Sequence, residues 1–343
     1  VGIWMFPDGK SPTFYFWWLT IGSLILGTAY TIFVVPYGAL GLELTGDYHE
    51  RTKLMGTKSM LHKASGVVNQ WLLKLVQLAG NNQLVAGSRI CGVILGFVIT
   101  ALGAITAWKV KERPRPITRV KRLPLWESWK AAFKRPDFIR LIAAQLMIYA
   151  SMLVIDNTGF YLNVFYVNGG DIGYGALMKG FYGMAFQVGG MCAIPFIVRL
   201  SRRVGKKRAF MICTGSILLA GVAKWFCYVP GAGYWLILPS LLMAPGMVAV
   251  MMLVPSMTAD ICDVDEVITG ARREGMFNAV LGWMLKIALS GSIFAAGVTL
   301  QLTGWVTDLG AAQSEDTFLA MRIAFAGGTV VLAGLALWSM SGY

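Results

Sequence analysis

Charged residues are scarce in this chain: they make up 14% of its 343 residues, whereas a soluble domain carries about 25%. Histidine occurs only as His49 and His62, and the five cysteines are scattered without a close pair. Glycine pairs such as Gly189-Gly190 are not followed by the Lys-Ser/Thr pair that holds nucleotide phosphates. These shortages disfavour a soluble domain, a disulfide framework, a resident metal site and a histidine-based catalytic centre.

Long apolar runs fill most of the chain, with 56% hydrophobic residues and a mean hydropathy of +0.62. A helix that spans a membrane needs about 20 mostly apolar residues. Nine segments meet this requirement, at roughly 13–42, 60–80, 86–108, 138–167, 175–199, 209–229, 233–257, 275–303 and 318–341. The second is the weakest, because Asn69, Gln70 and Lys74 interrupt it. We therefore predict an all-α, polytopic membrane helix bundle.

The positive charge is concentrated in a few loops. Eleven of the 30 Lys and Arg residues lie between Lys109 and Arg140, and six more lie between Arg199 and Arg208. The loops at the opposite helix ends carry almost none. Because cytoplasmic loops are enriched in Lys and Arg, this alternation predicts a multi-pass protein of the inner (plasma) membrane with a cytoplasmic C-terminus.

The long basic loop at 109–137 divides the predicted helices into three before it and six after it. We predict three regions: 1–108 as the remainder of an N-terminal helix bundle, 109–137 as a cytoplasmic central loop, and 138–343 as a six-helix C-terminal bundle. If the two halves match, about three helices precede residue 1. The chain is therefore expected to be an N-terminally truncated fragment of a twelve-helix transporter.

An internal repeat supports two related halves. Val35-Pro36 lies at the end of the first predicted helix and is followed by acidic and then basic residues, and the same order follows Val254-Pro255. Repeats between halves are typical of secondary transporters.

Both repeated segments resemble a known family. The run from Pro36 to Thr52 is similar to the helix IV signature of the glycoside-pentoside-hexuronide:cation symporters, which include the melibiose carriers and belong to the major facilitator superfamily. The run 259–275 resembles the helix X–XI signature of that family, and 202–208 resembles its basic turn after helix VIII. The resemblance covers the whole chain and implies a major facilitator fold that lacks about the first three helices. It also implies a secondary active symporter that moves a sugar, glycoside or uronide with Na⁺ or H⁺ by alternating access.

Lys286 is the only charged residue in the apolar stretch 275–302. A lysine at bilayer depth costs about 2.5–3.5 kcal/mol, so we expect it to face a bundle interior or a watery cavity and to have an acidic or polar partner. The resemblance implies that Lys286 lies near the cation pocket and that the hydroxyl of Thr31 helps to line it. We assign both residues to cation binding and coupling.

Polar and aromatic residues within the predicted helices are candidates for the substrate cavity. Asn69, Gln70 and Lys74 interrupt one helix; Tyr149 and Asp156 share a helical face with Gln145; and Trp283 lies one turn from Lys286. The full set of cavity candidates is Tyr30, Asn69, Gln70, Lys74, Tyr149, Asp156 and Trp283. The resemblance further implies a cluster of cytoplasmic gate charges that hold the two halves together, namely Asp47, Arg51, Asp260, Asp263, Arg272 and Glu274.

The expected partners are a small sugar-like solute, a coupling cation and the lipid bilayer. We expect no nucleic acid, no cofactor, and no metal beyond a transported Na⁺, and the resemblance implies a monomer. Val34 and Gly38 stand where sugar-binding members have an acid and a tryptophan, and Met251 stands where they have an aromatic residue. These departures keep open a carrier of another amphiphilic solute, such as a lysolipid. A membrane enzyme or a scaffold is a remote alternative.

Overall fold

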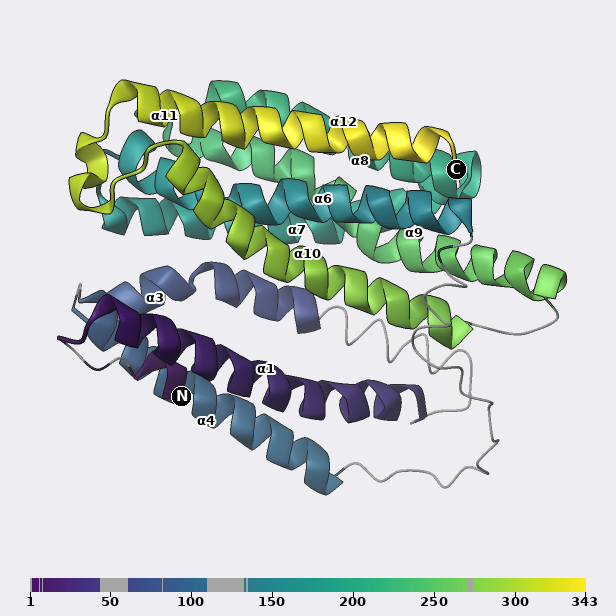
Figure 1. The fold of residues 1–343 in the computed structure, drawn as a ribbon, viewed down its shortest axis with the longest axis horizontal. Coiled ribbons are helices and arrows are strands. Elements are labelled where there is room, and N and C mark those ends of the chain that lie inside the picture. The colour runs from purple at the N-terminus through teal and green to yellow at the C-terminus, as the bar shows by residue number, and fades with distance from the viewer. Residues whose placement is uncertain are drawn as a thin grey trace. The chain divides into compact units, whose positions relative to one another are not determined.

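The computed structural model describes residues 2–5, 7, 9–43, 61–81, 83–109, 133, 135–269 and 274–343. Every regular element in these segments is a helix (Figure 1), so the predicted all-α class is confirmed. The chain forms two compact units, Val1–Val120 and Lys121–Tyr343. Their boundary falls inside the basic loop at 109–137, most of which lies outside the described residues; the predicted domain limits stay predictions.

The N-terminal unit contains the short helix η1 (Gly2–Trp4), α1 (Pro12–Glu43), a helical segment at 61–70, α3 (Leu72–Ala79) and α4 (Leu84–Lys109). α3 packs against α4 at two glycines. A Cβ atom at Gly87 would overlap the carbonyl oxygen of Val76, and one at Gly80 would overlap the backbone of Gly87. The absence of side chains at Gly80 and Gly87 therefore permits the tight connection between these two helices.

The C-terminal unit contains the remaining helices, which follow one another with short connections. They are α6 (Pro136–Tyr161), the π-helix η2 (Leu162–Val167), α7 (Ile172–Val204), α8 (Lys206–Cys227), η3 (Gly233–Leu236), α9 (Ile237–Thr269), α10 (Glu274–Leu302), η4 (Thr307–Ala312), α11 (Glu315–Arg322), the π-helix η5 (Ile323–Gly327) and α12 (Gly328–Ser341).

Local signals set several of these helix ends. Pro136 occupies the first turn of α6, where its missing N–H has no intrahelical partner to lose. The side chain of Asp171 caps α7 by accepting from the backbone N–H of Tyr174, and Ser314 caps α11 in the same way. Gly205, with φ of 85°, makes the turn between α7 and α8.

The core of the C-terminal unit is a continuous apolar cluster. α6 packs against α10 and α12, while α9 packs against α7 and α8. Phe138 and Phe277 are fully buried and meet edge to face with ring centroids 4.8 Å apart, which fixes α6 on α10. At Gly246 a Cβ atom would overlap the side chain of Ile217, so α8 and α9 approach closely there.

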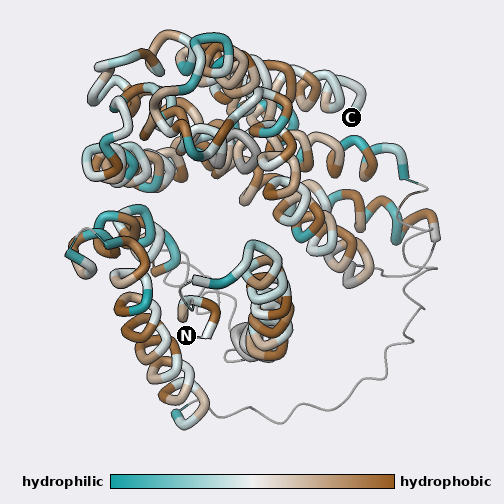
Figure 2. The backbone as a smooth tube through the Cα atoms, turned by 60° about the vertical axis from the view of Figure 1, so that its left-hand side comes forward, coloured by the Kyte–Doolittle hydropathy of each residue, from teal (hydrophilic) through white to brown (hydrophobic). Residues whose placement is uncertain are grey.

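Seven helices in the described part of the chain are long and apolar enough to cross a membrane. They cover the predicted spans except those at 60–80 and 138–167. The first of these two is interrupted at Trp71. The second, α6, includes side chains at 153–157 that lie outside the described residues, so the span at 138–167 stays a prediction. Figure 2 shows hydrophobic residues along the length of the helices. These features define a multi-pass membrane protein.

Candidate functional site

Lys286 lies on the exposed side of α10. Phe277, Val280, Leu281 and Met284 are buried at helical spacing, which turns one face of α10 toward the core and leaves Lys286 outside it. Within the described residues, Lys286 makes no hydrogen bond or ion pair. Trp283, one turn away, is also exposed, at 52%. The C-terminal unit thus presents an amine beside an indole, and its interior does not supply the partner that we expected for the amine.

Tyr149 of α6 lies beneath an exposed methionine of α9. Its side chain is 3% exposed, and its hydroxyl donates to the Sδ atom of Met251 at 3.8 Å. The side chain of Gln145, one turn earlier on α6, hydrogen-bonds Tyr149. Gln145 is 7% exposed, and its Oε1 atom has no hydrogen-bond partner among the described residues. A buried polar atom without a hydrogen bond costs about 1–3 kcal/mol. The Oε1 atom of Gln145 can therefore accept a hydrogen bond from a further donor.

Asp156 and Asn163 follow Gln145 and Tyr149 along the chain, in α6 and η2 respectively. Asp156 lies in α6, but its side chain is outside the described residues. Asn163 is fully buried and donates to the carbonyl oxygen of Gly175 at 2.7 Å, so it joins η2 to α7.

The cavity candidates of the N-terminal unit are mostly exposed. Tyr30 is 65% exposed, and the Thr31 hydroxyl donates to the carbonyl oxygen of Gly27 at 2.8 Å. The lone pairs of that hydroxyl stay available to a cation. Asn69 is exposed and Gln70 is half-buried. The Lys74 amine donates to Gln77 at 3.3 Å along the same helix. The assignments of these residues stay predictions.

The predicted gate charges fall into three groups. Asp47, Arg51 and Arg272 lie outside the described residues, and Glu274 begins α10 with a side chain that is not described. Asp263 is exposed on α9. Asp260 accepts from the Lys206 amine through both carboxylate oxygens at 2.6 Å. Since Lys206 belongs to the same unit, this pair joins α8 to α9; a pairing of Asp260 across the two halves stays a prediction.

An ion pair that sequence reasoning did not identify joins α6 to α9. The Nε and terminal N–H groups of Arg135 donate to Oδ1 of Asp265 at 2.9 and 2.8 Å. The Asp265 side chain is only 2% exposed. One signal was available: Ile261, Cys262 and Asp265 share the buried face of α9, and an acid in a buried stripe requires a partner.

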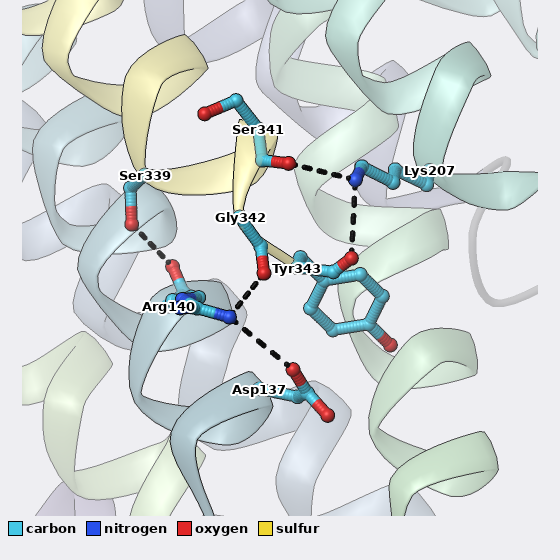
Figure 3. Close-up of polar contacts among 7 residues, drawn as sticks. All are labelled: Asp137, Arg140, Lys207, Ser339, Ser341, Gly342 and Tyr343. Carbon is cyan, nitrogen blue, oxygen red and sulfur yellow. Dashed lines mark hydrogen bonds and ion pairs between the residues drawn. The ribbon is translucent and has the colours of Figure 1, made fainter.

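The end of α12 is tied to α6 and α8 by a second polar cluster (Figure 3). Its members are Asp137, Arg140, Lys207, Ser339, Ser341, Gly342 and Tyr343. The Lys207 amine donates to the carbonyl oxygens of Ser341 and Tyr343, each at 3.0 Å. The Ser339 hydroxyl donates to the carbonyl oxygen of Arg140 at 3.0 Å. Burial raises the pKa of the Tyr343 phenol, and the negative charges of Asp260 and Asp137 raise it further.

A buried lysine, Lys224, joins α8 to α12. Its amine is held by the Thr329 hydroxyl at 3.1 Å and lies 4.4 Å from the ring centroid of Phe325. Lys224 is 5% exposed, and Thr329 and Phe325 belong to α12 and η5. Cation–π attraction is stronger when the charge is desolvated, so this contact stabilises the seam between the two helices.

The N-terminal unit also contains an apolar cavity of about 630 Å³ between η1 and α1. Its lining includes Trp4, Trp17 and Trp18, and Phe14 stacks on Trp18. The predicted site residues Tyr30 and Thr31 do not line it. Among the described residues, no group of three or more His, Cys, Asp or Glu side chains is placed to hold a metal ion.

The bundle of long apolar helices defines a polytopic membrane protein. The chain belongs to the family of MFS/sugar transport proteins, whose model matches residues 1–343. The predicted family is thereby confirmed at the level of the major facilitator sugar transporters, which are carriers and not enzymes.

Curated relatives carry names from the same class. The chain is 28% identical to an uncharacterized symporter of Synechocystis sp. over 64% of this chain and 40% of that protein. It is 25% identical to a putative sulfoquinovose importer of Salmonella typhimurium over 88% of this chain and 62% of the relative. It is 22% identical to a glucuronide carrier protein homolog of Escherichia coli over 91% and 67%. The chain therefore spans about two thirds or less of the length of these relatives.

A solved structure supports the fold. A bacterial homologue of the human lysosomal transporter Spinster, in an inward-facing and unoccupied conformation, matches 87% of this chain and 73% of its own chain. The TM-score is 0.51 at 15% sequence identity. At this identity the likeness concerns the fold alone, and it agrees with a major facilitator architecture.

Proposed function

We propose that this protein is a secondary active symporter that moves a sugar-like solute together with Na⁺ or H⁺ by alternating access. The observation that carries the proposal is Lys286, an amine on the exposed face of an apolar helix with no partner among the described residues. Lys286 lies within the candidate membrane span Ala279–Leu302. An ionisable group inside a membrane span requires a counter-charge or a watery cavity. The counter-charge is either a transported anion or a carboxylate of the carrier that pairs in turn with Lys286 and with the coupling cation.

The coupling mechanism follows from competition for negative charge. When no cation is bound, the Lys286 ammonium pairs with a carboxylate of the carrier and stabilises its ionised form. A proton or Na⁺ at that carboxylate removes the attraction and frees the amine for the solute. Thr31 is the hydroxyl proposed to complete the cation site. The coupling ion is the only non-solute ligand that this scheme requires.

Anionic sugars are the first solutes to test. Two relatives are named for a sulfonated sugar and for glucuronides, and a free lysine amine is a suitable partner for either anion. The exposed indole of Trp283 beside Lys286 offers an apolar surface for a sugar ring. A lysophospholipid in the same panel tests the other solute class that the sequence left open.

Uptake by cells that express the complete protein tests this proposal. Radiolabelled sulfoquinovose and methyl β-D-glucuronide are supplied with and without Na⁺, and with and without a protonophore. Wild-type uptake should depend on one ion gradient, and Lys286→Ala should reduce accumulation about 100-fold without changing protein level. Lys109→Ala, which removes an exposed lysine at the end of α4, should transport normally. Normal ion-dependent accumulation by Lys286→Ala would overturn the role of this residue.

We also propose that the C-terminus is cytoplasmic, because the basic loops alternate with nearly neutral ones. On this topology the exposed Asp263 is available to the other half, while Asp260 is engaged by Lys206. Asp263→Ala should therefore increase labelling of a cytoplasmic-side cysteine by an impermeant thiol reagent, and Asp260→Ala should do so less. A reporter enzyme that is active only outside the cytoplasm can be fused to the C-terminus. Activity of this fusion would contradict the proposed topology.

A further inference from the structure

The pair Gln145–Tyr149 combines a hydrogen-bond acceptor that lacks a donor with a donor that has only a weak acceptor. The buried Oε1 atom of Gln145 has no partner among the described residues. The Tyr149 hydroxyl points at a thioether sulfur, Sδ of Met251, at 3.8 Å. A thioether is a poor acceptor in comparison with a hydroxyl oxygen. The Gln145 acceptor and the Tyr149 donor lie on neighbouring turns of α6, since the two residues are four apart and share a face.

A hydroxyl group complements this pair, because it donates through its hydrogen and accepts through its oxygen. We propose that Gln145 and Tyr149 recognise a hydroxyl group of the transported solute, and that the Met251 side chain covers the pair when no solute is bound. The solute O–H donates to Oε1 of Gln145, and its oxygen accepts from the Tyr149 hydroxyl. This inference rests on the proposed transport function and assigns the solute to the polyhydroxylated compounds.

Met251 is suited to act as a cover. It is 53% exposed although its sulfur contacts the hydroxyl of Tyr149, a side chain that is 3% exposed. Methionine is unbranched and has three rotatable bonds, so it changes rotamer at low cost. Rotation of its side chain removes the sulfur from the Tyr149 hydroxyl and opens the pair to the exposed side of α9.

The surroundings of the pair strengthen a hydrogen bond made there. Tyr149 belongs to the apolar core cluster, together with Ile148, Val248 and Val250. In such low-dielectric surroundings a hydrogen bond is stronger than at a wet surface, and an analogue that lacks the hydroxyl leaves the buried groups unpaired. The pair therefore provides selectivity for a hydroxyl, while the charge of an anionic solute is left to Lys286.

Competition among deoxy sugars tests the inference. The probe is radiolabelled methyl β-D-glucuronide, taken up by cells with the complete protein, and the competitors are its 2-, 3- and 4-deoxy analogues. In the wild type, one analogue should compete about tenfold more weakly than the parent sugar. Tyr149→Phe and Gln145→Met should each raise the KM for the parent about tenfold and abolish the disadvantage of that one analogue. Tyr234→Phe, which alters an exposed tyrosine of η3, should keep the wild-type pattern.

A second measurement separates recognition from structural support. Met251→Cys should react faster with N-ethylmaleimide when the probe is bound, and Tyr149→Phe should remove that effect. If Tyr149→Phe and Gln145→Met raise the KM for all analogues equally, or leave the wild-type ranking intact, the inference is overturned and the symport proposal stands. If the wild type takes up none of the hydroxylated probes, both the proposed function and this inference fail.

Discussion

Breaking the ion pair between Arg135 and Asp265 should destabilise the C-terminal unit strongly. The Asp265 side chain is 2% exposed, and one of its oxygens receives two N–H groups of Arg135 at 2.8 and 2.9 Å. Arg135→Ala removes the guanidinium from a buried ion pair, and breaking such a pair costs about 3–5 kcal/mol. For a unit of this size, each kcal/mol shifts Tm by about 2–4 °C, so we expect a decrease of about 6–20 °C.

Substitution of the acid should destabilise the unit less than substitution of the arginine. Asp265→Asn keeps an acceptor for the guanidinium, and the Arg135 side chain is 22% exposed, so water compensates it in part; we expect about 1–2 kcal/mol. Replacing both residues by apolar ones, as Arg135→Met with Asp265→Leu, should recover much of the loss, because no buried charge remains.

These differences in Tm can be measured by heating the purified protein in detergent with a reagent that becomes fluorescent when it reacts with an exposed thiol. Cys262 is 5% exposed and lies three residues before Asp265, so loosening of this part of α9 makes a thiol reactive. Asp137→Ala is the matched control, since the Arg140–Asp137 pair is exposed and 3.7 Å apart and should contribute less than about 1 kcal/mol. A Tm of Arg135→Ala that equals the Tm of Asp137→Ala would refute the reasoning.

Three further outcomes follow from the C-terminal unit. Gly246→Ala should destabilise by about 1–3 kcal/mol, because the new Cβ overlaps Ile217, whereas Gly215→Ala, with open space around it, should not; thermal unfolding compares them. Thr329→Val should cost about 1–3 kcal/mol because it removes the oxygen that holds the buried Lys224 amine, and Thr329→Ser should restore it. The Tyr343 phenol, whose pKa is raised, should stay neutral when free tyrosine ionises near pH 10. The docking of Tyr343 should therefore be intact below that pH and weaken as pH rises through the raised pKa; absorbance at 295 nm, with Tyr343→Phe as the blank, tests this, and ionisation at the ordinary value would contradict it.

The helices were largely predictable because the length of an apolar run is a local property. The spans predicted at 13–42, 86–108 and 275–303 match α1, α4 and α10 closely. The polar residues near 70 indicated a weak second span, and the helix there is interrupted at Trp71. The π-helices η2 and η5 interrupt predicted spans without a signal in hydropathy, since their geometry depends on packing against neighbouring helices.

Side-chain partners were much harder to predict. Arg135 and Asp265 are 130 residues apart, and Lys224 and Thr329 are 105 apart, so no spacing within one helix brings them together. Helical spacing did predict that Tyr149 and Gln145 share a face, because that relation lies within α6. It did not reveal that the Tyr149 hydroxyl contacts Met251 of α9.

The charged groups of the C-terminal unit differ in whether the unit itself supplies their partner. Asp265 and Lys224 are buried, and each is held by a partner within the unit. Asp260 is exposed yet engaged by Lys206. Lys286 differs, because it stands on an apolar helix and no described residue binds it. A charge that is paired within the unit needs no further partner, whereas the role that we propose for Lys286 requires a partner outside the described residues, either a carboxylate of the carrier or the solute. In the symport mechanism that we propose, coupling between solute and cation follows from which of these partners the amine binds at each stage of the transport cycle.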